Sequence, residues 1–116
     1  MPRNRRLGAE AEDAAADYVC GLGYILITRN YHVRGAEIDM VALDGETLVF
    51  FEVRQRQKGG WALPEETVTL SKQKRLWQAA EQYLSDVLGK EAVVRFDVIA
   101  IEGDAMRHHK DAFRPA

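Results

Sequence analysis

The sequence is poor in residues that form covalent or metal cross-links, because its 116 residues include one cysteine and three histidines. Cys20 has no partner for an intrachain disulfide. Its neighbours Tyr18, Val19 and Leu22 predict a buried thiol, and we expect a reducing cytoplasm as the setting. His108 and His109 have no third ligand at a useful spacing, so they do not predict a zinc site.

The sequence also lacks an apolar run of transmembrane length and an excess of basic charge. Its basic N-terminal residues run into an alanine-rich, acid-containing segment, which is not the apolar region of a secretion signal. We therefore expect no membrane partner. The net charge of −2 means that binding to a polyanion would rely on local basic clusters, at 2–6, 54–58 and 72–75. Each cluster alone is more typical of a solvated surface.

The length and the 47% hydrophobic content fit one domain over residues 1–116, with flexible ends at about 1–6 and 104–116 and a flexible loop at about 57–66. The hydrophobic periodicity predicts a helix from Ala11 to Gly21 or Gly23, then strands over 24–33, 36–43 and 46–56. A second helix, capped by Ser71 and stopped by Gly89, and a strand over 92–101 follow. The residues beyond Glu102 predict a surface segment or frayed end. This element order predicts an α/β fold in which helices flank a mixed sheet. The apolar residues at helical spacing, which mark one face of each helix, are Ala11, Ala14, Ala15, Tyr18, Val19 and Leu22 in the first helix, and Leu76, Ala80, Tyr83, Leu84 and Val87 in the second.

The two central strands carry acids where a sheet core is expected. With Asp44 and Gly45 as the hairpin turn, Asp39 lies opposite Phe50 and diagonal to Glu52. Glu37, Asp39, Glu52 and Arg54 then share one face, and the other face is apolar: Ile38, Met40, Ala42, Val49, Phe51 and Val53.

Two carboxylates at this diagonal spacing can converge on one Mg²⁺ ion. Pairing of the acids with Arg54 and Arg56 on a solvated face is the alternative. The apolar residues Val41, Leu48 and Phe50 favour a partly buried cleft, where an unpaired charge is costly.

The two helices add further charged residues. Glu12 flanks the apolar stripe of the first helix and can point toward the sheet, with Glu10 and Asp13 as alternatives; acids near a helix N-terminus are also favourable without any ligand. The second helix begins with Lys72, Lys74 and Arg75, where cations are mildly unfavourable but free N–H groups could hold a phosphate.

The chain resembles the YraN family, which is similar to archaeal Holliday-junction resolvases and to the restriction-endonuclease-like superfamily. The resemblance rests on separated blocks in the right order. They are "GAEAE" at 8–12, "GYILITRNY" at 23–31, "AEIDMVA" at 36–42, "LVFFEVRQR" at 48–56, Lys72, and "VRFDVIAI" at 94–101.

The resemblance implies a restriction-endonuclease-like core and a divalent-metal site. Its implied ligands are Glu12, Asp39, Glu52 and the carbonyl of Val53, with Mg²⁺ or Mn²⁺ as the ion. Arg54 stands at the position of the superfamily's catalytic lysine; it supplies positive charge but is a poor proton acceptor. Lys72 is a candidate to replace the missing amine. Ala11 and Ala36 replace two glycines of the family pattern.

The resemblance further implies a metal-dependent nuclease acting on DNA, including branched DNA, as a homodimer. Its catalytic residues would be Glu12, Asp39, Glu52 and Arg54, and its phosphate contacts Arg54, Arg56, Lys72, Lys74 and Arg75. The alternatives are a non-catalytic nucleic-acid-binding module and a protein-interaction adaptor that retain the fold.

Overall fold

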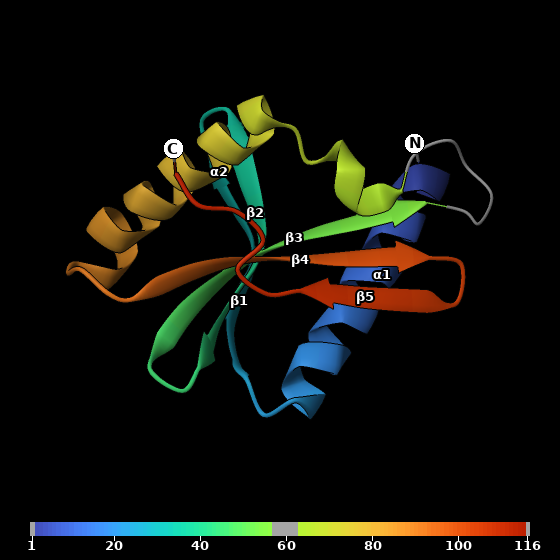
Figure 1. Ribbon diagram of the computed structural model, residues 1–116, viewed down its shortest axis with the longest axis horizontal. Coiled ribbons are helices and arrows are strands. Elements are labelled where there is room, and N and C mark those ends of the chain that lie inside the picture. The colour runs from blue at the N-terminus through green and yellow to red at the C-terminus, as the bar shows by residue number, and fades with distance from the viewer. Residues whose placement is uncertain (1, 57–62, 116) are drawn as a thin grey trace.

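The computed structural model describes the backbone of residues 2–56 and 63–115, and the side chains of residues 9–56 and 63–115. Helix α1 (Pro2–Gly21) is followed by strands β1 (Ile25–Val33), β2 (Ala36–Asp44) and β3 (Thr47–Arg56). The 3-10 helix η1 (Pro64–Thr67) precedes helix α2 (Leu70–Tyr83), which continues into the π-helical segment η2 (Leu84–Leu88). Strands β4 (Val94–Glu102) and β5 (Ala105–His109) follow (Figure 1).

The five strands form one mixed sheet in the order β1-β2-β3-β4-β5. Strands β3 and β4 are parallel, because the chain between them crosses over through α2, and the other neighbouring strands are antiparallel. The prediction of a mixed sheet flanked by helices is confirmed. No helix within residues 2–56 and 63–115 is long and apolar enough to cross a membrane.

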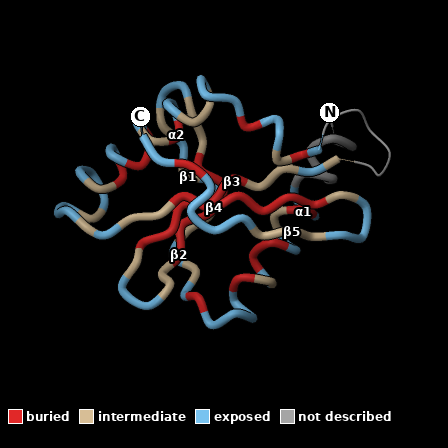
Figure 2. Tube along the Cα trace, in the orientation of Figure 1, coloured by how far each residue is buried: buried red, intermediate tan, exposed pale blue. Residues whose placement is uncertain are grey.

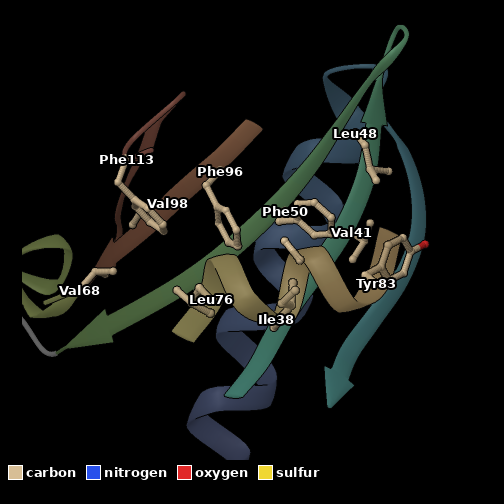
Figure 3. Close-up of a cluster of buried hydrophobic side chains, with 12 residues drawn as sticks. Ile38, Val41, Leu48, Phe50, Val68, Leu76, Tyr83, Phe96, Val98 and Phe113 are labelled. Carbon is tan, nitrogen blue, oxygen red and sulfur yellow. The ribbon is translucent and has the colours of Figure 1, made fainter. Parts of the chain in front are cut away.

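Each face of the sheet packs against one long helix. Buried residues of α1 meet Met40, Val49 and Phe51 on one face. Leu76 and Tyr83 of α2 cover the other face (Figure 3). The sheet is therefore buried in its middle strands, while exposed residues follow the loops and outer helix surfaces (Figure 2).

Helix α1 turns a different stripe toward the sheet from the one its sequence predicts. Ala15 and Val19 are fully buried, but Ala14 and Cys20 are exposed and Leu22 is 47% exposed. The prediction of a buried thiol is wrong. Ala16, which lies outside the predicted stripe, is buried, so the face of α1 that packs on the sheet is rotated from the predicted one.

The hairpin turn lies one residue later than predicted. Asp44 pairs with Thr47 as the last residues of β2 and β3, so Gly45 and Glu46 form the turn. Gly45 has a φ of +61°, a left-handed conformation that glycine adopts without steric cost. The shift moves each residue of β2 two positions along β3, and a shift by an even number of positions does not by itself transfer a residue to the other face.

The second helix begins two residues earlier than its predicted cap implies. The Thr69 hydroxyl accepts a hydrogen bond from the backbone N–H of Lys72 at 3.2 Å, so Thr69 is the N-cap and the prediction of Ser71 is wrong. Gly89 follows η2 with a φ of +74°, as predicted for a stop. Val87 is 56% exposed, because the π-helical turn rotates it off the predicted apolar face.

Strand β5 replaces the irregular segment predicted after Glu102. The sequence of β5 shows no apolar alternation, because ion pairs and not apolar packing fix its side chains. Arg107 binds Glu65 at 2.7 Å and Glu102 at 3.1 Å, and His108 binds Asp97 at 2.7 Å. Residues 57–62 of the predicted flexible loop at 57–66 fall outside the described residues, and its last four residues form the N-cap and the first three residues of η1.

The exposure of Cys20 gives a direct test of the packing of α1. We expect Cys20 to react rapidly with an aromatic disulfide reagent in the folded protein. In a Val19→Cys variant made on a Cys20→Ser background, the thiol is fully buried and should react only on unfolding. Slow labelling of native Cys20, followed by its absorbance, would contradict the position of the helix.

Candidate functional site

Asp39 lies at a break in the pairing of β1 with β2. Arg29 pairs with Met40 and Tyr31 pairs with Ile38, so Asp39 lies opposite Asn30, and neither belongs to the regular ladder. Asn30 has a φ of +56°, a left-handed conformation that asparagine tolerates better than most residues. The break turns the Asp39 carboxylate toward β3, where its Oδ2 accepts a hydrogen bond from the backbone N–H of Val53 at 2.7 Å.

The same break interrupts the alternation of side chains along β2. Ile38 packs with Val41 and Tyr31 in the cluster under α2, whereas Met40 packs in the cluster under α1. The prediction that Ile38 and Met40 share a face is therefore wrong, because a strict period of two does not continue through an irregular position.

Asp39 and Glu52, here named the acid pair, are closer than predicted. The ladder between β2 and β3 ends at the pair Met40 and Phe51, and Asp39 and Glu52 are the residues that come next on the two strands. The two carboxyl groups share a hydrogen bond. Asp39 is 9% exposed and Glu52 is 4% exposed.

Burial dominates the electrostatics of the acid pair. Loss of hydration, followed by the negative charge of Glu52, raises the pKa of Asp39 from 3.8 to about 8, against the lowering effect of the Val53 hydrogen bond. Burial also raises the pKa of Glu52, although the nearby charges of Arg54 and Lys72 oppose it. The acid pair therefore holds a shared proton near neutral pH, as two close carboxylates do when no cation separates them.

Glu12 lies near the acid pair but is held by other groups. Its Oε1 lies 3.8 Å from Arg29 Nη2, and Arg29 binds Asp13 more closely, at 2.8 Å. With its amide nitrogen facing the acids, Asn30 donates to Glu12 Oε1 and Glu37 Oε2, each at 3.0 Å. Burial, and next the charge of Glu37, raises the pKa of Glu12.

The structure thus brings together two of the three predicted carboxylate ligands. Within residues 9–56 and 63–115, no three histidine, cysteine, aspartate or glutamate side chains lie close enough to hold a metal ion. The donor chemistry of the acid pair fits a hard divalent cation, whose charge would replace the shared proton. Glu12 acts on Asp39 through its charge alone.

Arg54 and Arg56 follow the acid pair along β3. Arg54 Nε lies 2.8 Å from Glu52 Oε2, but its N–H is not directed at the oxygen, so this contact is an ion pair without a hydrogen bond. Arg56 Nη2 donates to Glu102 at 2.6 Å, while its buried Nε and Nη1 have no hydrogen-bond partner among the side chains of 9–56 and 63–115 or the described backbone. Both guanidinium groups therefore keep N–H donors for a further acceptor.

The three basic residues of α2 differ in position. Lys72 acts on Glu52 through its charge, so it lies on the side of the acid pair. Lys74 and Arg75 are exposed, and Lys74 lines a groove with Trp77 and Arg114. Of these residues, the structure brings only Lys72 into the field of the acid pair.

A second buried charged cluster was not identified from the sequence. Asp97 is fully buried, accepts hydrogen bonds from Arg95 at 2.8 and 2.9 Å, and lies 2.7 Å from His108 Nε2. The Tyr18 hydroxyl meets His108 Nδ1 at 3.0 Å. This cluster joins β4, β5 and α1, and its only sequence signal is the charge placed inside "VRFDVIAI".

Asn30 was likewise missed as part of the site. We expect Asn30→Ala to lower the free energy of unfolding by about 1–2 kcal/mol, because alanine is disfavoured at positive φ and cannot bond the two acids. Asn30→Gly keeps the backbone conformation and should cost less in urea unfolding. Equal losses for the two variants would show that the left-handed backbone contributes nothing.

The raised pKa of Asp39 predicts an unusual pH dependence. Between about pH 4 and pH 8 the folded state keeps a proton that the unfolded chain has lost, so the free energy of unfolding should fall as the pH rises through this window. The neutral amide introduced by Asp39→Asn mimics the protonated acid, and this variant should lose that part of the slope. Parallel urea-unfolding profiles for the two proteins from pH 4 to pH 8 would contradict the shared proton.

Comparison with known proteins places the chain in a family. The model of the uncharacterised protein family UPF0102 matches residues 11–101, which include Glu12, Asp39, Glu52 and Lys72. The UPF0102 protein of Chlorobium limicola is 48% identical over 100 residues, covering 86% of this chain and 78% of the relative. The UPF0102 protein of Geobacter sulfurreducens is 41% identical over 118 residues, covering 97% and 92%. That of Rhodococcus opacus is 40% identical over 118 residues, covering 97% and 100%. The resemblance to the YraN family is confirmed, and the chain belongs to the uncharacterised protein family UPF0102.

Proposed function

We propose that this protein is a metal-dependent nuclease that acts on phosphodiesters of DNA, including branched DNA, through a restriction-endonuclease-like core. The observation that carries the proposal is the acid pair: two buried carboxylates meet across neighbouring strands, and the pKa of Asp39 is raised to about 8. A divalent cation would relieve the desolvation and repulsion that now keep a proton on the pair.

Asp39 and Glu52 would hold Mg²⁺ or Mn²⁺, with Glu12 and the carbonyl of Val53 as further predicted ligands. When bound, such an ion polarises a phosphodiester and lowers the pKa of water. The hydrogen bond from Val53 N–H fixes the Asp39 carboxylate, so one side of the site is oriented before any ligand arrives.

The nearby cations have separate roles in this proposal. The guanidinium groups of Arg54 and Arg56 suit the phosphates on either side of the reacting one, because each is positively charged and a guanidinium can donate two parallel bonds. Arg54 supplies positive charge that offsets negative charge. Lys72 lies in the field of Glu52 and is the candidate amine for positioning or deprotonating water. Lys74 and Arg75, both exposed on α2, would contact DNA beyond the site, and a homodimer would bring two sites to one branched substrate.

A non-catalytic adaptor that binds nucleic acid or protein is a second candidate, and two ion pairs favour it. Arg54 lies against Glu52 and Arg29 lies near Glu12, so two of the three predicted ligands already have a positive neighbour. A site neutralised in this way needs no metal. It could retain phosphate contacts while lacking a group that accepts a proton from water.

A cleavage and binding panel tests the proposal. The wild-type protein should cut linear, flap or four-way DNA with Mg²⁺ or Mn²⁺ and not with EDTA, and Asp39→Asn or Glu52→Gln should reduce cleavage at least about 100-fold. Lys72→Ala should reduce it about 10-fold or more. Lys90→Ala, at an exposed lysine just after η2 that has no role in the proposed site, is the matched control and should stay within about two-fold.

Two outcomes of this panel oppose the nuclease. Cleavage that persists unchanged in both acid variants would reject the acid pair as the site. Salt-dependent binding without scission at any metal concentration would select the adaptor, because phosphate contacts alone release counterions without chemistry.

A further inference from the structure

A cleft with a volume of about 500 Å³ is lined in part by Val98, the β4 residue that pairs with Glu52. It lies where η1, the first turn of α2, β4, β5 and the C-terminal segment meet, a region crossed by the C-terminal chain in Figure 1. Its size is within the range of small-ligand sites. The lining residues used below are Glu65, Gln73, Val98, His109, Ala112 and Phe113.

The sheet register connects this cleft to the acid pair. Glu52 of β3 pairs with Val98 of β4, and Val98 pairs with His109 of β5. Neighbouring strands are about 4.8 Å apart, so the cleft begins one strand away from Glu52. Phe50 and Phe96 belong to the cluster under α2 and precede Glu52 and Val98 by two residues on their strands. Because side chains alternate along a strand, Glu52 and Val98 lie on the same face of the sheet as this cluster.

The lining of the cleft combines apolar surface with hydrogen-bonding groups. Val98 and the Phe113 ring, which stacks on Phe96 at 4.9 Å, give it an apolar floor. Gln73 Nε2 donates to the Val68 carbonyl at 3.0 Å, which fixes the amide at the rim. Glu65 is bound by Arg107 and His109, at 2.7 and 2.8 Å.

This combination favours a nucleobase over a phosphate. A base has an apolar face for Val98 and Phe113 and polar edges for an amide or an imidazole nitrogen. Lys110 also lines the cleft and could attract a phosphate, but a phosphate there would meet the carboxylate of Glu65 and an apolar floor, and both oppose a bound anion. The phosphate contacts belong instead to Arg54 and Arg56, on β3.

We propose that this cleft binds an unpaired nucleobase of the strand whose phosphodiester lies at the acid pair. The inference rests on the proposed function and narrows its substrate class. A base inside a duplex is paired and stacked, so it cannot enter the cleft without being extruded. The preferred substrates are therefore nucleic acids with unpaired nucleotides next to the reacting phosphodiester, such as single strands, flaps and junction arms with open bases.

The experiment measures binding by fluorescence anisotropy in EDTA, where no cleavage occurs. The probes are a 12-nucleotide thymidine strand, an abasic strand with the same phosphates, and a blunt duplex. Ala112→Trp fills the cleft: Ala112 is exposed, and the hydrogen bond from its backbone N–H to the Phe96 carbonyl does not involve its side chain. Ala14→Trp, at an exposed position on α1, is the matched control, and circular dichroism verifies that both variants fold.

The wild-type protein and Ala14→Trp should bind the thymidine strand about five-fold or more tightly than the abasic strand. Ala112→Trp should lose that difference while its affinity for the abasic strand and the duplex stays within about two-fold. Equal affinity of the wild-type protein for the two single strands, or an unchanged preference in Ala112→Trp, would overturn the inference.

The two proposals can fail separately in this design. Base-dependent binding that Ala112→Trp removes, in a protein that never cleaves DNA, would retain the cleft and reject the nuclease. Metal-dependent cleavage with no base preference would retain the nuclease and reject the cleft.

Discussion

The close approach of two buried carboxylates, Asp39 and Glu52, is the constraint on which the structure of the site depends. A sheet covered on both faces by helices has little room for charge, and each buried acid needs a proton, a hydrogen bond or a cation. The chain supplies a backbone N–H from Val53 to one acid and the positive field of Arg54 and Lys72 to the other. These contacts are insufficient to keep both acids ionised, and the pKa of Asp39 rises to about 8. A position so costly to stability is typical of a functional site.

The free-energy cost of burying the acid pair is linked to the irregular backbone at Asn30. Without the left-handed residue in β1, Asp39 would continue the alternation of β2, and its side chain would stand away from the β3 backbone. The break turns Asp39 toward Val53 and moves Ile38 into the cluster under α2. Asn30 also bonds Glu12 and Glu37, so one asparagine contacts the acids from α1 and β2. Local strain and charge are thereby concentrated at one point of the sheet, while the rest of both faces packs regularly.

The buried cluster around Asp97 has a different character, although it also places a carboxylate in the core. Its acid is fully satisfied by Arg95, His108 and the backbone N–H of Asp111, so it resembles a structural polar network. It fixes β5 to the edge of the sheet and connects that strand to α1 through Tyr18. Protein donors fully satisfy the buried carboxylate of Asp97, whereas they satisfy the carboxylates of the acid pair only in part.

The sequence by itself determined the elements whose signals are local. Hydrophobic period and turn glycines predicted both long helices, the first three strands and β4, and the separated motif blocks indicated the family and the three acids. Local pattern could not predict β5, because that strand is stabilised by ion pairs with residues distant in sequence. It could not place Cys20, Ile38 or Asn30, since their exposure and direction depend on which face α1 turns to the sheet and where the ladder breaks. Tertiary structure alone decided that Asp39 and Glu52 share a hydrogen bond while Glu12 remains with Arg29, because the distance between charges depends on packing, which sequence spacing does not encode.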